Sequence, residues 1–188
     1  TLIQIHYHDC PGGVRRVIGE YAQTFRELTN APVSQNVVVW AQRNGASLVT
    51  GATVLPVKGC DYHRYHSIRS FERDRDGLHL ILREVVESFR ALGPLCCLGH
   101  NLTLGKNPAL SSAFAALSRE YAQSGREVRF VSVIHDLAEQ GRMHLLAGLE
   151  HLAHKGYPIW DDLYLHNGSV RFATVSPVVR LAMQRAGI

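Results

Sequence analysis

Apolar positions recur along this 188-residue chain with two spacings, one typical of strands and one typical of helices. The run from Leu2 to Tyr7 alternates apolar and polar residues as a strand does, and an amphipathic segment follows from about Val14 to Leu28. Pro11-Gly12-Gly13 lies between them and has the composition of a turn. The chain is therefore predicted to open with a strand, a glycine turn and a helix.

The same two spacings continue to the end of the chain. Short β-branched or apolar runs between Asn, Gly and Pro predict strands, and apolar residues at every third or fourth position predict helices. The predicted strands are 37–40, 52–57, 95–98, 129–134 and 170–175, and the predicted helices are 77–92, 108–123, 143–154 and 177–185, with a long polar loop over 58–76. Alternating strands and helices predict a Rossmann-like, three-layer α/β domain with a mainly parallel sheet and helices on both faces.

Length and composition indicate one globular domain spanning residues 1–188. Hydrophobic residues make up 46% of the chain and charged residues 19%, which is ordinary for a folded domain. The 20 Lys and Arg exceed the 16 Asp and Glu by too little to favour a nucleic-acid partner. Because no apolar stretch approaches the ~20 residues that span a bilayer, no integral membrane segment is expected and a cytoplasmic location is predicted.

Three of the predicted strands are followed by residues that can bind an anion or a reacting group. His8 and then Gly12-Gly13 follow the first strand, and a Gly-Gly turn before a helix exposes backbone N–H groups to a ligand. Lys106 follows a later strand beside a helix start, and His135 ends the next one. These residues form the candidate site because carboxyl ends of parallel strands share one edge. The alternatives are a ligand-free turn, a solvated lysine and a structural histidine.

The turn from Gly99 to Asn107 has the glycines and lysine of a phosphate-binding P-loop but not its spacing. It is one residue too long, and Asn107 stands where Ser or Thr would bind magnesium. An NTPase is therefore excluded. What remains is Lys106 beside a helix N-terminus, an arrangement that suits a phosphate or a carboxylate.

Two further features leave alternatives open. Arg64, Arg69, Arg73 and Arg75 make the predicted loop basic, which suits a phosphorylated or acidic acceptor, but interleaved carboxylates favour a self-paired, solvated loop. The 11 histidines raise the alternative of a metal site. No HExxH motif is present and no histidine cluster has metal-ligand spacing, so no metal is expected.

Three motifs, in their order along the chain, resemble the N-terminal, acceptor-side domain of retaining GT-B glycosyltransferases. This group includes sucrose-phosphate synthases and bacterial mannosyl- and glucosyltransferases. The motifs are Pro11-Gly12-Gly13-Val14, the turn Gly99 to Asn107, and Val133-Ile134-His135-Asp136. The resemblance covers nearly the whole chain and depends on the order and spacing of individually loose motifs. It implies a hexosyltransferase that moves a hexose from a nucleotide sugar to a hydroxyl acceptor with retention at the anomeric carbon.

The resemblance also implies roles for single residues. Gly12-Gly13 would approach the donor's diphosphate, and His135 would contact the donor sugar near the reacting carbon. His100 and Lys106, with weaker support from His8, would hold a small or phosphorylated acceptor. The nucleotide sugar is then a substrate, and no cofactor or metal is implied. The turn departs from the family in its length and in having Asn rather than Ser after the histidine, so the acceptor's identity is not implied.

Members of this family bind the nucleotide sugar chiefly through a second Rossmann-like domain. The resemblance implies that this chain ends where the hinge to that domain begins, so an excised or truncated half that is inactive alone is expected. A second hypothesis is a stand-alone, non-catalytic module that binds an anionic sugar or sugar phosphate. A flavodoxin-like or nucleotide-binding protein ranks last because no GxGxxG motif follows any predicted strand.

Overall fold

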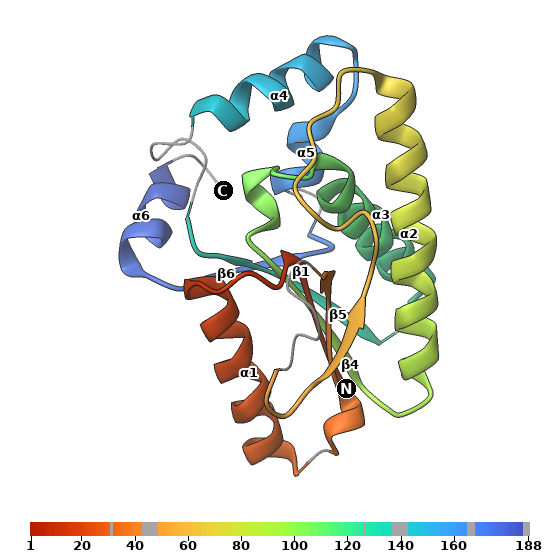
Figure 1. Ribbon diagram of the computed structural model, residues 1–188, viewed down its shortest axis with the longest axis vertical. Helices are drawn as coiled ribbons and strands as arrows, with labels where there is room; N and C mark the ends of the chain where they lie inside the picture. The colour runs from red at the N-terminus through yellow and green to blue at the C-terminus, as the bar shows by residue number, and fades with distance from the viewer. Residues whose placement is uncertain (31, 43–48, 126, 137–142, 165–167, 186–188) are drawn as a thin grey trace.

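The computed structural model describes residues 1–30, 32–42, 49–125, 127–136, 143–164 and 168–185. They form a six-stranded sheet, in which every neighbouring pair is parallel, with helices on both faces (Figure 1). The strands are β1 (Leu2–His8), β2 (Asn36–Ala41), β3 (Thr53–Pro56), β4 (Leu95–His100), β5 (Val128–Ile134) and β6 (Arg171–Thr174). The helices are α1 (Gly13–Thr29), α2 (Ile68–Arg90), α3 (Pro108–Ser124), α4 (Met143–His154), α5 (Ile159–Tyr164) and α6 (Pro177–Arg185). The predicted Rossmann-like α/β class is confirmed.

The order of strands places a crevice at the middle of the sheet. The order is β3-β2-β1-β4-β5-β6, so the chain moves outward from β1 to β3 and then returns to the other side of β1. β1 pairs with β2 on one side and β4 on the other. Where strand order reverses in an open parallel sheet, the loops at the carboxyl ends diverge and leave room for a ligand. This point lies between β1 and β4.

The sheet separates two sets of packed side chains. On one face, Ile5 of β1 belongs to the large core formed with α2, α3, α4 and α5. On the other face, Trp40 of β2 packs with Ile18 of α1, and Ile134 of β5 packs with Met183 of α6. Figure 1 shows α1 and α6 on one side of the sheet and α2 and α3 on the other. The buried strands are therefore covered on both faces, as parallel strands usually are.

The loop predicted over residues 58–76 is shorter than expected, because α2 begins at Ile68, nine residues before the predicted start at Gly77. Ser67 caps this helix, since its side chain accepts a hydrogen bond from the backbone N–H of Ser70 at 3.2 Å. Phe71 is the only fully buried residue of the first two turns, and most of their other residues are charged. Apolar spacing therefore could not predict these first turns of the helix.

The other predicted boundaries lie within a few residues of the observed ones. Asn107 caps α3 as predicted, with its Oδ1 accepting the N–H of Leu110 at 3.2 Å, and Pro108 is the first helical residue. α5 was not predicted, because six residues are too few to show a helical period. Within the described ranges, no helix is long and apolar enough to cross a membrane.

Candidate functional site

A cleft of about 300 Å³ opens at the carboxyl edge of the sheet, at the crevice beside β1. Five of the six residues predicted to form the site line this cleft: His8, Gly12, Gly13, Lys106 and His135. They come from the end of β1, the turn before α1, the turn before α3 and the residue after β5. The sixth, His100, lies at the end of β4 with a fully buried side chain. The fold therefore brings together residues that are far apart in the sequence.

The glycine turn presents the start of α1 to the cleft. Gly12 is the N-cap of this helix, no side chain caps it, and both Gly12 and Gly13 are exposed. Arg15 holds the preceding turn, since its Nη1 donates a hydrogen bond to the carbonyl of Asp9 at 2.9 Å. The first N–H groups of a helix have no partner within it and carry partial positive charge. This wall of the cleft is therefore suited to an anion.

A buried chain of hydrogen bonds connects α1 to the histidine at the end of β5. Gln4 donates through Nε2 to the carbonyl of Ile18 in α1 at 3.1 Å, so its Oε1 is the amide's accepting atom. His100 Nε2 lies 3.0 Å from that Oε1, and His100 Nδ1 lies 3.3 Å from His135 Nε2. Gln4 and His100 are both fully buried. The series of hydrogen bonds thus runs from Ile18 through Gln4 and His100 to His135.

The chain of contacts determines where the imidazole protons lie. Because the Oε1 of Gln4 can only accept, His100 must donate through Nε2, and a neutral His100 then accepts at Nδ1. His135 must therefore carry its proton on Nε2 and donate it to His100. A neutral His135 is left with an unprotonated Nδ1, which can accept a hydrogen bond from a hydroxyl group. His100 thus fixes the ring of His135 at the cleft.

A second buried histidine, His6, also lies at the cleft. Its Nδ1 donates to the carbonyl of His100 at 3.0 Å, and only 5% of the residue is exposed. Burial lowers the pKa of His6 from 6.5 to about 4, although the hydrogen bond to His100 opposes the shift. Burial also lowers the pKa of His100 well below its usual value and that of His135 more moderately. All three rings are therefore neutral at pH 7.

Asn101 clamps the turn after β4 onto the turn after β5. Its backbone lies in the left-handed region at φ 61°, and its Nδ2 donates to Asp136 Oδ1 at 2.7 Å. Its Oδ1 accepts the backbone N–H of His135 at 3.0 Å. Tyr7, from β1, donates to the carbonyl of Asn101 at 3.1 Å. Asn101 therefore connects the ends of three neighbouring strands, β1, β4 and β5, at the lining of the cleft.

Lys106 and Tyr62 form a pair at the cleft's opposite wall. The ammonium of Lys106 donates to the Tyr62 hydroxyl at 2.8 Å and lies 4.4 Å from the centre of its ring. The ring of Tyr62 also packs edge-on against His8 at 4.5 Å between ring centres. His8 Nδ1 in turn accepts the backbone N–H of Cys10 at 3.2 Å. A cation is thus held beside an aromatic wall and keeps donors for a ligand.

The histidines of this cleft contact other groups of the protein through their ring nitrogens. Among the residues that the structure describes, no three His, Cys, Asp or Glu side chains gather as metal ligands would. Nδ1 of His6 and both ring nitrogens of His100 contact carbonyl, amide or imidazole atoms. Their arrangement is that of a hydrogen-bonded network.

Sequence reasoning missed Gln4, Tyr7, Asn101 and Tyr62 as parts of this site. Gln4 occupies a polar position of an alternating strand, which in isolation indicates a solvent-facing side chain. In the fold this position faces α1 and is buried. A signal was present in the opening strand, where Gln4, His6 and His8 form an unbroken polar row on a strand with helices on both sides.

Comparisons with known proteins found no similar protein: no family model, curated protein or solved structure matches the chain.

Proposed function

We propose that this domain is the acceptor-side half of a retaining hexosyltransferase, which moves a hexose from a nucleotide sugar to a hydroxyl of a small or phosphorylated acceptor. One observation carries the proposal. The uncapped start of α1 at Gly12-Gly13, the ammonium of Lys106 and the ring of His135 line one cleft. These supply two groups that attract anions and one oriented acceptor of hydrogen bonds, as a sugar joined to a diphosphate requires.

In the proposal, the donor's diphosphate lies against the start of α1. The bond between the anomeric carbon and a phosphate oxygen breaks, and negative charge develops on the departing diphosphate. Backbone N–H groups at Gly12-Gly13 face this side of the cleft without a side-chain cap. They stabilise the leaving group without first having to lose a protein partner.

His135 orients the sugar at the reacting carbon. Its Nδ1 accepts a hydrogen bond from a sugar hydroxyl, because its Nε2 proton is engaged by His100. A bond forms between the anomeric carbon and the acceptor oxygen, and the proton of that hydroxyl leaves with the diphosphate. Lys106, with His8 beside it, holds the acceptor. The ring of His100 is buried with both nitrogens engaged, so we assign it the positioning of His135 rather than acceptor contact.

The remaining contacts of the donor, including those to its base and ribose, are assigned in this proposal to a second Rossmann-like domain. A stand-alone module that binds an anionic sugar is the second candidate. It is favoured by the fact that Gly12-Gly13 and Lys106 belong to this domain alone. The two candidates differ in whether the cleft recognises a diphosphate and in whether transfer follows.

A charge added at the start of α1 tests the diphosphate site in this chain. A Cβ at Gly13 would meet no atom within 4 Å, so Gly13→Asp is accommodated, and a carboxylate near a helix N-terminus is favourable for the helix. The same carboxylate repels a bound anion. We expect Gly13→Asp to weaken inorganic diphosphate binding by about tenfold or more in calorimetric titration, without a loss of stability.

Gly19→Asp is the matched control, because it places the same charge on α1 at a glycine that is also free of close atoms. Equal weakening by both variants would show a general charge effect and contradict the site. UDP-glucose should bind no more tightly than diphosphate, since the base has no pocket in the proposal. Tight binding of UDP would contradict an acceptor-side half.

A further inference from the structure

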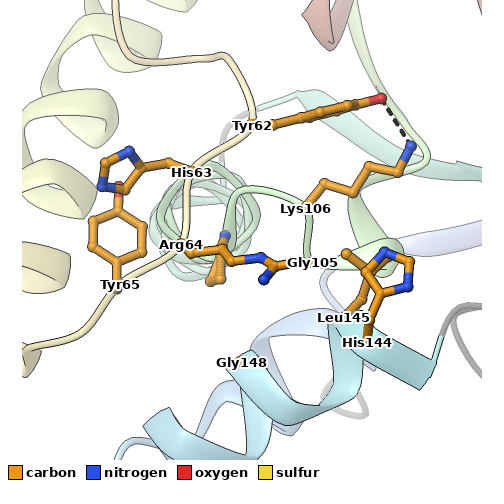
Figure 2. A pocket seen from close by; sticks show the side chains of 10 residues that line it. Tyr62, His63, Arg64, Tyr65, Gly105, Lys106, His144, Leu145 and Gly148 are labelled. Atoms are coloured by element: carbon orange, nitrogen blue, oxygen red, sulfur yellow. Dashed lines mark hydrogen bonds between the residues drawn. The ribbon is translucent and has the colours of Figure 1, made fainter.

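A second cavity, of about 480 Å³, lies on the other side of the Tyr62 and Lys106 pair. Figure 2 shows it between the loop that carries Tyr62 to Tyr65 and the first turns of α4. Tyr62 and Lys106 line both this cavity and the histidine-lined cleft. Its volume is in the range of small-molecule sites. The two cavities are thus neighbours that share one aromatic ring and one ammonium group.

The described lining of the cavity contains two cationic side chains and no carboxylate. Arg64 and Lys106 line it, together with His63 and His144, and no Asp or Glu is among its described lining residues. Arg64 has no hydrogen bond or ion pair within the described part of the chain, and Figure 2 shows its side chain extending toward the turn at Gly105. The guanidinium therefore keeps its donors available for an anion.

Arg64 differs in this respect from two arginines that follow it in the sequence, Arg73 and Arg75. Arg73 pairs with Asp74 at 2.9 Å and Arg75 pairs with Asp76 at 2.7 Å, both on α2. The self-pairing expected for this basic stretch holds for these two residues, but only Arg73 is also solvated, since Arg75 is 25% exposed and donates to the Tyr157 hydroxyl at 3.0 Å. It does not hold for Arg64, which lies on the loop before α2.

Both walls of the cavity are fixed to the turn before α3. On the loop side, Asn107 Nδ2 donates to the carbonyls of Gly59 at 2.6 Å and Asp61 at 2.7 Å, and the N–H of His63 donates to the carbonyl of Lys106 at 3.0 Å. On the α4 side, Leu149 packs so closely on Gly105 that an added Cβ would lie 2.6 Å from its Cδ2. The cavity is therefore held open by the fold before any ligand arrives.

We propose that this cavity binds the anionic group of the acceptor, a phosphate or carboxylate on a sugar-sized molecule, between Arg64 and Lys106. Tyr62, Tyr65 and Leu145 supply apolar contact for the ring that carries the group. An acceptor anchored here directs its hydroxyl past Tyr62 and Lys106 into the cleft. This inference rests on the proposed function in calling the ligand an acceptor, while the anion site itself depends only on these residues.

Titration of the chain with glucose 6-phosphate tests the site, with glucuronate and glucose as carboxylate and neutral probes. We expect glucose 6-phosphate or glucuronate to bind more tightly than glucose, and the tighter of the two identifies the anion. Arg64→Ala should weaken that binding about tenfold, because it removes a charge-assisted hydrogen bond, and Arg64→Lys should restore part of it. Equal affinities of all three probes for the unaltered chain would overturn the proposal.

Arg69→Ala is the matched control. Arg69 is an exposed arginine on the first turn of α2 that does not line the cavity, so its removal changes net charge equally without touching the site. Equal weakening by Arg69→Ala and Arg64→Ala would overturn the proposal, as would no weakening by either. Inorganic diphosphate measures the cleft separately, and Arg64→Ala should leave its affinity unchanged. A parallel loss of diphosphate binding would mean one shared anion site and would also overturn the proposal.

The two proposals fail in different ways. If Gly13→Asp does not change diphosphate binding while Arg64→Ala weakens glucose 6-phosphate binding, the diphosphate site is contradicted and the anion site of the second cavity is supported. If Gly13→Asp weakens diphosphate binding but Arg64→Ala leaves the affinities for glucose 6-phosphate and glucuronate unchanged, the diphosphate site is supported and the anion site of the second cavity is contradicted.

Discussion

The two cavities that meet at Tyr62 and Lys106 use polar residues in opposite ways. At the cleft and beneath it, His6, His100 and Gln4 are buried and hydrogen-bonded, and the histidines stay neutral because burial disfavours their charged forms. In the second cavity, Arg64 carries an exposed, cationic guanidinium group. Burial thus fixes the orientation and the proton positions of the histidines and Gln4. Exposure leaves Arg64 able to attract a ligand.

This difference predicts how each cavity responds to its surroundings. A network of buried neutral histidines is sensitive to pH, since a proton added to His100 Nδ1 removes the acceptor that His135 needs, and burial disfavours a charge on the other rings. A cavity with exposed cations is sensitive to salt, because ions screen its attraction for an anion. Variants at each cavity therefore distinguish the two.

His135→Ala should produce the largest effect, in an enzyme that carries this domain together with a donor-binding half. Loss of the oriented Nδ1 acceptor should lower turnover by about 10²-fold, with little change in donor affinity, because the contact matters most at the reacting carbon. Steady-state kinetics measures both. His154→Ala, at an exposed histidine on α4, is the control and should leave turnover unchanged. Unchanged turnover in His135→Ala would contradict the proposed role of His135 at the reacting carbon.

The free energy of unfolding should fall as pH drops from about 6.5 toward 4. The pKa of His6 is lowered from 6.5 to about 4 in the folded chain, so the unfolded chain binds more protons in this window. The contribution is therefore complete above pH 6.5 and is lost on acidification, by about 3 kcal/mol for His6 alone. Urea unfolding at several pH values measures it.

His6→Gln should make the pH dependence of stability shallower between pH 6.5 and 4, because the variant lacks the group whose pKa shifts. His63→Gln is the control, at an exposed histidine of the second cavity, and should retain the full slope. Identical slopes in His6→Gln and the unaltered chain would contradict a neutral, buried His6.

A methyl group at Gly105 should affect the second cavity and spare the cleft. Gly105 and Gly125 have nearly the same left-handed backbone, at φ 60° and 65°, so Ala costs about 1 kcal/mol at either position. At Gly105 the added Cβ also meets Leu149 at 2.6 Å, whereas at Gly125 it meets nothing within 4 Å. We expect Gly105→Ala to be less stable than Gly125→Ala by about 1–2 kcal/mol in urea unfolding.

The same pair of variants separates the cavities by binding. Gly105→Ala displaces Leu149, hence the α4 wall, and should lower glucose 6-phosphate affinity while diphosphate affinity stays unchanged. Gly125→Ala lies at the far end of α3 and should alter neither. If Gly105→Ala changed diphosphate binding instead, the α4 wall would belong to the cleft.

Most of the fold followed from local patterns in the sequence. In the part of the chain that the structure describes, the apolar spacings predicted all six strands and five of the six helices, and the Asn107-Pro108 pair predicted the start of α3 to the residue. The errors are at α2 and α5. The first turns of α2 are mostly charged and owe their helical form to the Ser67 cap and the burial of Phe71, whereas α5 has only six residues. Neither feature creates an apolar period.

The candidate site followed from sequence only in part. Strand ends in a parallel sheet must share an edge, so His8, Gly12-Gly13, Lys106 and His135 could be expected to lie close together, and they line one cleft. His100 could not be separated from them by sequence. Its place at the end of β4 is that of a ligand contact, but its side chain lies beneath the cleft between Gln4 and His135.

The sequence by itself determined the elements and the sheet edge, because periodicity, caps and glycine turns act over a few residues. Only the tertiary structure decided which polar groups are buried, since burial depends on which face of a strand a distant helix covers. It placed Gln4 under α1, closed the contact between His100 and His135, and set Arg64 against the turn at Lys106. Proton positions and ligand-facing charges depend on such long-range contacts, and no local pattern encodes them.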